Sequence, residues 1–261
     1  MNVKGLIAAG GEATRLGELT RVVNKHLLPV GGWPMIYYPL QLLQLAGVRE
    51  VMIVTGQGHA GQVIDLLGNG QMEERGEATP LFDLDLTYKV QVEAGGIAQV
   101  VGMAQSFAGG DDLVVCLGDN IFEYVEAAAI RSFVDGDDGA AVFVKDVPDP
   151  ERFGVVVYGE DGRVTDVVEK AGVVDMRYDA PPSSDAVVGL YCYSPDVFDV
   201  IRGLRPSSRG ELEITDVNRH YAEQGALACH RVSGWWEDAG TQESLPEIGA
   251  LIARTGVNKV A

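Results

Sequence analysis

The 261-residue chain is long enough for one large domain or two small ones, and its 46% apolar and 22% charged residues form an ordinary globular composition that excludes a disordered tail protein. Its longest apolar runs are far shorter than the ~20 residues of a membrane span, and no basic-then-apolar leader opens it, so we expect a soluble cytoplasmic protein without a membrane partner. The net charge of −18 at pH 7 argues against nucleic acid as a partner, and a phosphate ligand would need cations of its own close by.

Strand-like and helix-like patterns alternate over the first half of the chain. Apolar runs predict strands at residues 4–9, 51–55 and 113–117, and an alternating pattern predicts another at residues 84–92. Helical periodicity predicts helices at residues 34–46, 60–67 and 97–107, and Pro39 should kink the first of them or mark its true beginning. Units of strand, helix and strand predict an α/β fold, a parallel sheet with helices on both faces.

The second half of the chain is less regular. Strands are predicted at residues 140–144, 154–158, 164–168, 186–193 and 226–232, and helices at residues 195–201, 211–224 and 242–254. Residues 72–82 and 171–185 are predicted surface excursions, the second rich in turn residues. Because no low-complexity linker interrupts the chain, we predict a single domain over residues 1–261.

The loop after the first strand is a candidate phosphate site. Ala9, Gly10 and Gly11 end that strand, and glycines there let backbone N–H groups approach a phosphate while Arg15 adds a fixed charge. A plain glycine turn with a surface arginine is the alternative, since neither the P-loop nor the G-x-G-x-x-G pattern is present. Lys25, one of six lysines, precedes an apolar run and could converge with Arg15 on the phosphates of one ligand, although taken separately each is more often a surface charge.

Two acidic residues are candidate metal ligands. Asp119 lies two residues beyond the predicted strand at residues 113–117, where open α/β sheets bind ligands, although an Asx turn explains it equally well. Asp238 lies among small residues that permit close approach of a ligand, with a surface turn as the alternative. Together they would supply the hard oxygen atoms that Mg²⁺ prefers, and Glu237 is a weaker candidate.

A second cluster of charges follows in the sequence. Glu169 and Lys170 end a predicted strand, and Arg209 precedes a predicted helix. Lys170 and Arg209 could hold a second phosphate group while Glu169 accepts hydrogen bonds from hydroxyl groups. An exposed ion pair and a charge beside a helix start are the alternatives.

The remaining reactive side chains are interpreted as structural. His26 has no partner in the sequence that would form a base–nucleophile pair. The cysteines, Cys116, Cys192 and Cys229, lack metal-binding spacing and fit buried residues in a reducing compartment.

An ordered set of motifs resembles the sugar-1-phosphate nucleotidyltransferases, and among them the shorter glucose-1-phosphate thymidylyltransferases. The set consists of GG-x-x-[TS]-R-L, N-K-H-L-L-P-V, GG-I-A-Q, L-G-D-N-I-F, D-P-E-R-F-G-V, E-K, R-G-E-L-E-I-T-D-V-N and G-W-W-x-D-A-G-T. It runs in order over nearly the whole chain. The resemblance implies a Rossmann-like three-layer domain with a mostly parallel, mixed central sheet and elaborated sugar-binding loops. It divides the domain into a nucleotide-binding half (about residues 1–135), a sugar-phosphate-binding half (about 136–241) and a C-terminal helix (242–261).

The same resemblance implies the reaction. The family joins a nucleoside triphosphate to a sugar 1-phosphate and releases pyrophosphate, without a covalent enzyme intermediate. By this resemblance, Ala9, Gly10, Gly11 and Arg15 bind the triphosphate and Lys25 neutralises charge near the α-phosphate. The matching metal ligands are Asp119 and Asp238, which would hold Mg²⁺. The residues that match those reading the pyrimidine edge are Gln91 and Gly96.

On the sugar side, Lys170 and Arg209 match residues that bind the phosphate, and Glu169 matches one that binds sugar hydroxyls. Gly154 and Val188 match other residues of the sugar pocket, with Val188 in place of the usual threonine. Ala171 stands where the resemblance implies a proline, and the segment from there to Asp185 is longer than the resemblance leads us to expect, which leaves the identity of the sugar open.

The expected substrates are dTTP and glucose 1-phosphate, with UTP or another hexose 1-phosphate as the alternative. A catalytically silent nucleotide-sugar-binding regulator and a structural or interaction protein are the more distant alternatives. The resemblance also implies a homo-oligomer. Because the longer relatives form a regulatory nucleotide site with a C-terminal extension beyond the equivalent of Ala261, we expect no feedback by that route.

Overall fold

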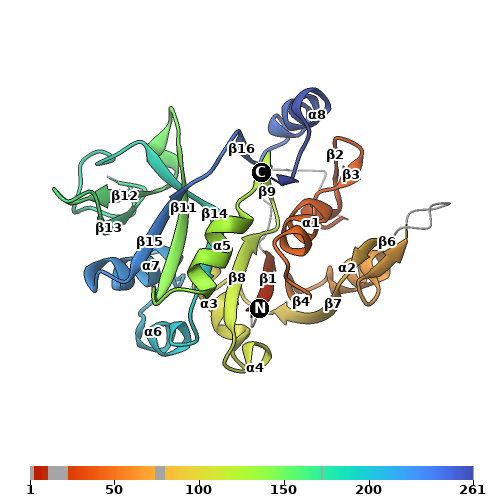
Figure 1. The fold of residues 1–261 in the computed structure, drawn as a ribbon, viewed down its shortest axis with the longest axis horizontal. Helices are drawn as coiled ribbons and strands as arrows, with labels where there is room; N and C mark the ends of the chain where they lie inside the picture. Colours follow the sequence, from red (N-terminus) through yellow and green to blue (C-terminus); the bar gives the residue numbers. More distant parts are fainter. Residues whose placement is uncertain (1–2, 11–22, 74–79, 172, 261) are drawn as a thin grey trace. The chain divides into compact units, whose positions relative to one another are not determined.

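The computed structural model describes residues 3–10, 23–73, 80–171 and 173–260 (Figure 1). The chain divides into two compact units. Unit 1 consists of Met1–Ala94, Cys116–Ala127 and Ser233–Ala261, and unit 2 of Gly95–Val115 and Ala128–Val232. The chain passes from unit 2 into unit 1 inside strand β8 (Asp112–Leu117). The single domain with a nucleotide-binding half and a sugar-phosphate-binding half stays a prediction.

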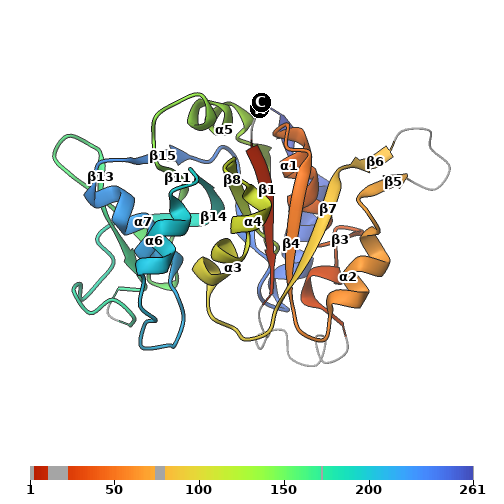
Figure 2. The same ribbon diagram turned by 90° about the horizontal axis from the view of Figure 1, so that it is seen from below.

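Unit 1 contains the predicted parallel sheet. Strands β1 (Val3–Ala9), β4 (Glu50–Gly56) and β7 (Asp85–Gln91) are neighbours in that order, and both pairings are parallel (Figure 2). Beyond β1, the end of β8 continues the sheet, because the Gly118 N–H donates to the Ala8 carbonyl at 2.9 Å. Parallel strands need crossover connections, and helices α1 (Tyr37–Leu45) and α2 (Ala60–Leu67) lie in two of them. The predicted α/β class is confirmed.

Helix α1 begins three residues later than the sequence predicted. Pro39 then lies in its first turn, where an N–H has no acceptor within the helix, so the proline requires no kink. One face of the helix joins a core cluster in which Met35 and Tyr38 pack against Ile121, Ala239 and Ile248. Burying such side chains is the main favourable contribution to the stability of this unit.

Short ladders connect distant segments of unit 1. Strand β9 (Asn120–Phe122) pairs antiparallel with β16 (Trp236–Asp238), and β10 (Tyr124–Val125) pairs parallel with β17 (Lys259–Val260). The other short elements are a 3-10 turn, two hairpins and the last helix: η2 (Lys25–Leu27), β2 (Pro29–Val30) with β3 (Trp33–Pro34), β5 (Gln71–Glu73) with β6 (Pro80–Asp83), and α8 (Ser244–Thr255). The β5–β6 hairpin occupies the predicted excursion at residues 72–82, of which 74–79 lie outside the described residues.

Unit 2 is a mixed sheet with helices. Its strands are β11 (Ala140–Asp146), β12 (Gly154–Tyr158), β13 (Val164–Glu169), β14 (Asp185–Tyr193) and β15 (Leu227–Arg231). The order is β13-β12-β14 followed by β8, and β11 pairs antiparallel with β14 and parallel with β15. All five strands follow the sequence prediction to within a few residues.

The helices of unit 2 differ more from the prediction. Residues 97–107 form two helices, α3 (Ile97–Met103) and α4 (Gln105–Ala108), instead of one. Helix α5 (Ala127–Val134), whose first residue belongs to unit 1, was not predicted. The remaining elements are η3 (Pro150–Arg152), α6 (Val197–Gly203) and α7 (Ile214–Glu223).

Within the described part of the chain, no helix has both the length and the apolar character needed to cross a membrane. The three cysteines are free thiols; Cys116 and Cys192 are buried and Cys229 is partly buried. This agrees with their interpretation as small apolar side chains.

Candidate functional site

The end of β1 and the end of β7 bring two predicted nucleotide-binding residues together in unit 1. Gln91 is the last residue of β7, is 7% exposed and pairs in register with Gly56 of β4. A Cβ on Gly10 would lie 2.8 Å from Gln91 Oε1, so only glycine leaves that amide in place. Ala9, the last residue of β1, directly precedes Gly10 in the sequence and is buried. The carboxyl ends of parallel strands therefore gather these residues at one edge, where such sheets bind ligands.

Two further residues of the glycine loop, Gly11 and Arg15, lie outside the described residues. Their predicted contacts with a triphosphate stay predictions.

Lys25 and Asp119 form an ion pair in unit 1. The Lys25 ammonium contacts Asp119 Oδ2, and the two side chains are only 15% and 14% exposed. Burial acts to raise the pKa of the Asp119 carboxyl, but the charge and hydrogen bond of Lys25 outweigh it and hold that pKa below its usual range. The sequence separates the two by 94 residues, and the structure supports the view that both belong to one charged site.

The β9–β16 ladder brings the second candidate metal ligand to the same place. Asp238 stands opposite Asn120 in the register, and the Ala239 N–H donates to the Asp119 carbonyl at 2.8 Å. Asn120 is held between its neighbours, since its amide donates to Asp119 Oδ1 at 3.0 Å and its oxygen accepts from Trp236 Nε1 at 2.7 Å. The ladder and this hydrogen bond thus hold the backbone of Asp238 beside that of Asp119 and Asn120.

The donor set of Asp119 and Asp238 fits a magnesium ion. In the described ranges no group of three or more histidine, cysteine or carboxylate side chains could enclose a metal. Mg²⁺ does not require such a cage, because proteins usually hold it through one or two carboxylates together with substrate phosphates and water. Asp119 is ionised at neutral pH, and Asp119 and Asp238 would supply the hard oxygen atoms; their role as metal ligands stays a prediction.

His26, next to Lys25 in the sequence, is buried, and its ring and backbone N–H both contact Asn24. Its ring Nδ1 lies 2.8 Å from Asn24 Oδ1, which also accepts the His26 backbone N–H at 2.9 Å. Because an amide oxygen only accepts, Nδ1 carries the proton, and Nε2 has no hydrogen-bond partner among the residues described. Burial, followed by the charge of Lys25, lowers the pKa of His26 to about 3, against the opposing effect of Asp119. The ring is neutral and structural, as the sequence indicated.

The predicted sugar-phosphate residues gather in unit 2. Gly154 of β12 stands opposite Glu169 of β13, and a Cβ on Gly154 would lie 3.2 Å from Glu169 Oε2. The hydroxyl of Thr215, in α7, donates to that same oxygen at 2.5 Å. Lys170 follows Glu169, and its backbone N–H donates to the Phe153 carbonyl at 3.1 Å.

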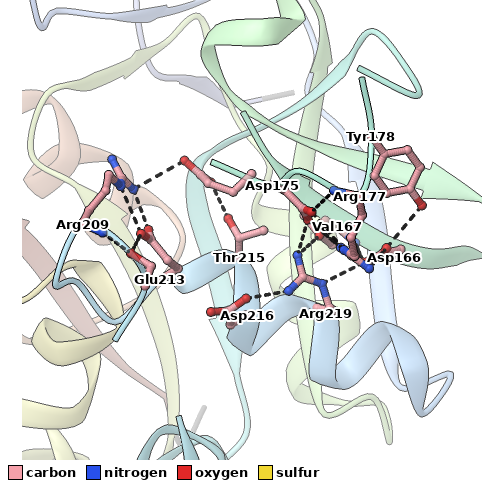
Figure 3. Close-up of polar contacts among 12 residues, drawn as sticks. Asp166, Val167, Asp175, Arg177, Tyr178, Arg209, Glu213, Thr215, Asp216 and Arg219 are labelled. Atoms are coloured by element: carbon pink, nitrogen blue, oxygen red, sulfur yellow. Dashed lines mark hydrogen bonds and ion pairs between the residues drawn. The ribbon is translucent and has the colours of Figure 1, made fainter. Parts of the chain in front are cut away.

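Arg209 completes this group through a carboxylate that was not singled out in the sequence. Glu213, 7% exposed, accepts from Arg209 Nε at 3.1 Å and from its terminal nitrogen at 2.6 Å (Figure 3). The hydrogen bonds to Glu213 raise the pKa of the Arg209 guanidinium, so it stays charged. Its terminal nitrogen also lies 3.7 Å from Glu169 Oε1. Glu213 and Thr215 both belong to the R-G-E-L-E-I-T-D motif, and the spacing of Arg209 and Glu213 by four residues was the available signal.

Two other residues of unit 2, Gly96 and Val188, are also predicted binding residues. Gly96 precedes α3 with a φ of 89°, and a Cβ there would lie 2.4 Å from the Leu212 carbonyl oxygen, so close backbone packing explains the glycine. Val188 lies in β14 with its side chain fully buried. Their contacts with a pyrimidine and a sugar stay predictions.

Comparison with known proteins agrees with this architecture. The model of the nucleotidyl transferase family matches residues 4–255. A glucose-1-phosphate thymidylyltransferase of Neisseria meningitidis is 39% identical over 96% of this chain and 82% of its own length. The low-salt glycan biosynthesis nucleotidyltransferase Agl11 of Haloferax volcanii is 36% identical over 96% of this chain, which spans 66% of the length of Agl11.

Solved structures show the same fold. A Bacillus anthracis chain described as a glucose-1-phosphate thymidylyltransferase superposes with a TM-score of 0.85 at 43% identity, over 95% of this chain and 94% of that one. A UDP-glucose pyrophosphorylase superposes with a TM-score of 0.83 over 97% and 99% of the two chains, and at 22% identity it shows the fold alone. With a family match over nearly its whole length, this chain belongs to the nucleotidyl transferase family and is a sugar-1-phosphate nucleotidyltransferase similar to the glucose-1-phosphate thymidylyltransferases.

Proposed function

We propose that the protein transfers a thymidylyl group from dTTP to glucose 1-phosphate, or to a related hexose 1-phosphate, in a Mg²⁺-dependent reaction. An oxygen of the sugar phosphate attacks the α-phosphorus, and the bond from that phosphorus to the bridging oxygen breaks in line. Pyrophosphate carries away the bonding electrons, and the product is a nucleoside diphosphate sugar. No protein nucleophile is required.

The observation that carries this proposal is the Lys25–Asp119 pair beside Asp238 in unit 1. Direct displacement at phosphorus depends on positioning and on neutralising charge, which groups fixed before the substrate arrives provide best. Lys25 supplies a cation that is only 15% exposed. Asp119 and Asp238 would hold Mg²⁺, which when bound to phosphate oxygens withdraws negative charge from the reacting group.

The choice of substrates rests on similarity and on the residues of both units. Identity of 39% to thymidylyltransferases supports dTTP and glucose 1-phosphate. The group of Glu169, Lys170 and Arg209 supports a phosphorylated sugar, since it combines two cations with a carboxylate that can accept from hydroxyls. Gln91 is proposed to read the pyrimidine edge, where the one amide serves thymine and uracil alike.

The test is pyrophosphate release by the full chain in the presence of Mg²⁺, with dTTP, UTP, ATP, CTP and GTP each paired with a panel of sugar 1-phosphates. Turnover with dTTP and glucose 1-phosphate is the expected result. Preference for UTP, or turnover only with another sugar, would overturn the substrate assignment and retain the chemistry. If the folded protein bound nucleotide but turned over no pair of nucleoside triphosphate and sugar 1-phosphate, the proposed transferase activity would be refuted. That result would favour a catalytically silent nucleotide-sugar-binding regulator.

We propose a cytoplasmic location and a homo-oligomer as well. The free thiols support a reducing compartment. The homo-oligomer is proposed from the family resemblance, and sedimentation of the full chain tests it, with a monomer at micromolar concentration as the contrary result.

A further inference from the structure

The backbone of Lys170 is held in a conformation that side chains rarely adopt. Its φ is 41°, and Lys170 and Asn258 are the only non-glycine residues with positive φ in the described ranges. Such a conformation costs roughly 1–3 kcal/mol and persists only where the surroundings enforce it. The Lys170 carbonyl accepts from the N–H groups of Val173 and Val174 at 2.9 and 3.0 Å, so a tight turn follows the predicted phosphate ligand.

Asp175 closes this turn. Its backbone N–H donates to the Glu169 carbonyl at 3.0 Å, which links the two ends of the turn. Its side chain is only 9% exposed and accepts hydrogen bonds from Arg177 through Nε at 3.0 and 3.1 Å and a terminal nitrogen at 2.6 Å. A second guanidinium, that of Arg219, donates to Asp175 Oδ2 at 2.9 Å. Asp175 and Arg177 lie in the segment of residues 171–185, which the sequence analysis predicts as a surface excursion.

Arg219 ties the turn to the elements that carry the sugar side. From α7 it donates to Asp166 Oδ1 in β13 at 2.9 Å and to the Val167 carbonyl at 2.9 Å (Figure 3). It also bonds Asp216, one turn earlier in its own helix, at 2.6 Å. Helix α7 therefore holds the turn through Arg219 and holds Glu169 through the hydroxyl of Thr215.

The network joins three carboxylates to two guanidiniums. Asp166 and Asp175 lie between Arg177 and Arg219, and Arg177 bonds both of these carboxylates. The third carboxylate, that of Asp216, bonds Arg219. The hydrogen bond from Arg177 outweighs burial and keeps the pKa of Asp175 below its usual range, so the Asp175 carboxylate is ionised at neutral pH. Removing these charged groups from water costs about as much free energy as their attraction provides, so partly buried ion pairs contribute little net stability. Their main effect is to favour one arrangement of the chain. The arrangement fixed here is the turn after Lys170.

We propose that Asp175 is a positioning residue for the sugar 1-phosphate: held by Arg177 and Arg219, it fixes the turn that sets the direction of the Lys170 side chain. The inference rests on the proposed role of Lys170 in binding that phosphate. Lysine has a flexible four-carbon stem, so a fixed Cα direction reduces the number of positions its ammonium samples. The ion pairs that Asp175 and Arg177 form in the segment of residues 171–185 would thereby raise the affinity for the sugar phosphate without contacting it.

The test compares Asp175→Asn with Asp199→Asn. Asparagine retains the size and one oxygen of Asp175 but loses the charge that binds two guanidiniums. Asp199, in α6, forms an exposed ion pair with Arg202 and serves as the matched control in the same unit. We expect Asp175→Asn to raise the KM for glucose 1-phosphate about tenfold, the scale of a small misplacement, with the KM for dTTP unchanged. Asp199→Asn should change neither constant by more than twofold.

Arg177→Gln provides a second variant that is safer for folding, because Arg177 is half exposed. Arg177→Gln should also raise the KM for glucose 1-phosphate, but less than Asp175→Asn does. The double variant should show less than the sum of the two effects, since the two side chains share one interaction. Hydrogen exchange of the Asp175 amide, bonded to Glu169, should be faster in Asp175→Asn than in Asp199→Asn.

Four results would overturn the proposal and are distinguishable. A lowered melting temperature with an unchanged KM for the sugar phosphate would make Asp175 merely structural. An equal rise in both KM values, or unchanged exchange of the residue 175 amide, would also refute positioning. Absence of turnover by the unmodified protein on every sugar phosphate would instead refute the proposed function, and the positioning role with it.

Discussion

The neutral, buried His26 predicts a specific dependence of stability on pH. The folded protein keeps the ring uncharged down to a pH of about 3, whereas the unfolded chain protonates it near the ordinary pKa of 6.5. Between these values the unfolded chain binds one proton more than the folded chain, so stability must fall as the pH is lowered from about 6.5 toward 3. The limiting slope is about 1.4 kcal/mol per pH unit for this one group.

The size of the effect follows from the two pKa values. Integrating the linkage relation from pH 7 to pH 5 gives a loss of about 2 kcal/mol from His26 alone. This window lies above the ordinary pKa values of aspartate and glutamate. The other three histidines, His59, His220 and His230, contribute to the total slope but not to a difference measured against a variant that retains them.

His26→Asn is the appropriate variant, because the asparagine amide can replace Nδ1–H as a donor to Asn24. Urea denaturation of both proteins at pH 7, 6 and 5 gives the free energies of unfolding. The cavity left by the ring lowers the stability of the variant at every pH, so it cancels from the comparison of slopes. We expect the unmodified protein to lose about 2 kcal/mol more than His26→Asn between pH 7 and pH 5. Parallel curves would refute a neutral buried His26.

Three further predictions concern the predicted active site. Asp119→Asn and Asp238→Asn should each cut turnover severely without unfolding the protein, and near-normal pyrophosphate release at saturating Mg²⁺ would contradict their role as metal ligands. Lys25→Ala should lower kcat roughly 10²- to 10³-fold through loss of a preorganised charge, and a change confined to KM would show that Lys25 merely binds the ground state. Gly96→Ala should destabilise the protein by roughly 1–3 kcal/mol, because its Cβ would lie 2.4 Å from a backbone oxygen in a left-handed conformation; an unchanged midpoint of urea unfolding would contradict this.

The strands were predictable because each carries its own apolar pattern, but the depth of their burial was not. The sequence predicts that every second residue from 84 to 92 lies on the same face of a strand. The first of these residues, Leu84, is buried. Val90 and Val92 are 39% and 68% exposed, while the polar Gln91 between them is buried. Strand β7 is the last strand of its sheet in unit 1, so the cover on its faces depends on neighbours that local periodicity does not reveal.

The short elements escaped prediction for a related reason. Helix α5 buries Ala127, Ile130 and Phe133 at a helical spacing of three, but eight residues give a weak periodic signal. The β9–β16 ladder pairs segments more than a hundred residues apart, and two three-residue strands have no pattern of their own. Of the two candidate metal ligands, Asp238 lies in this ladder and Asp119 directly precedes it; the sequence singles out Asp119 by its place after a predicted strand and Asp238 by the small residues that follow it.

The residues of the candidate site also differ in how well the sequence predicts them. Lys25, Asp119, Glu169 and Arg209 belong to motifs, and the structure pairs Lys25 with Asp119 in unit 1 and brings Arg209 to Glu169 in unit 2. Asp175 was not singled out, because an aspartate in a turn-rich segment has no distinguishing neighbour until the fold brings Arg219 to it.

The discontinuous make-up of unit 1 has a consequence for protein synthesis. Asp119 and the strands of its parallel sheet precede Ser233, but Asp238 and helix α8, which joins the core beside Met35, come from the last segment of the chain. At ~5–20 residues per second, roughly 6–23 s separates the emergence of Asp119 from that of Ser233. During that interval the ribosome carries a chain with one of the two predicted magnesium ligands and without helix α8 on the core cluster of Met35. The proposed magnesium site is therefore incomplete until residues 233–261 are made.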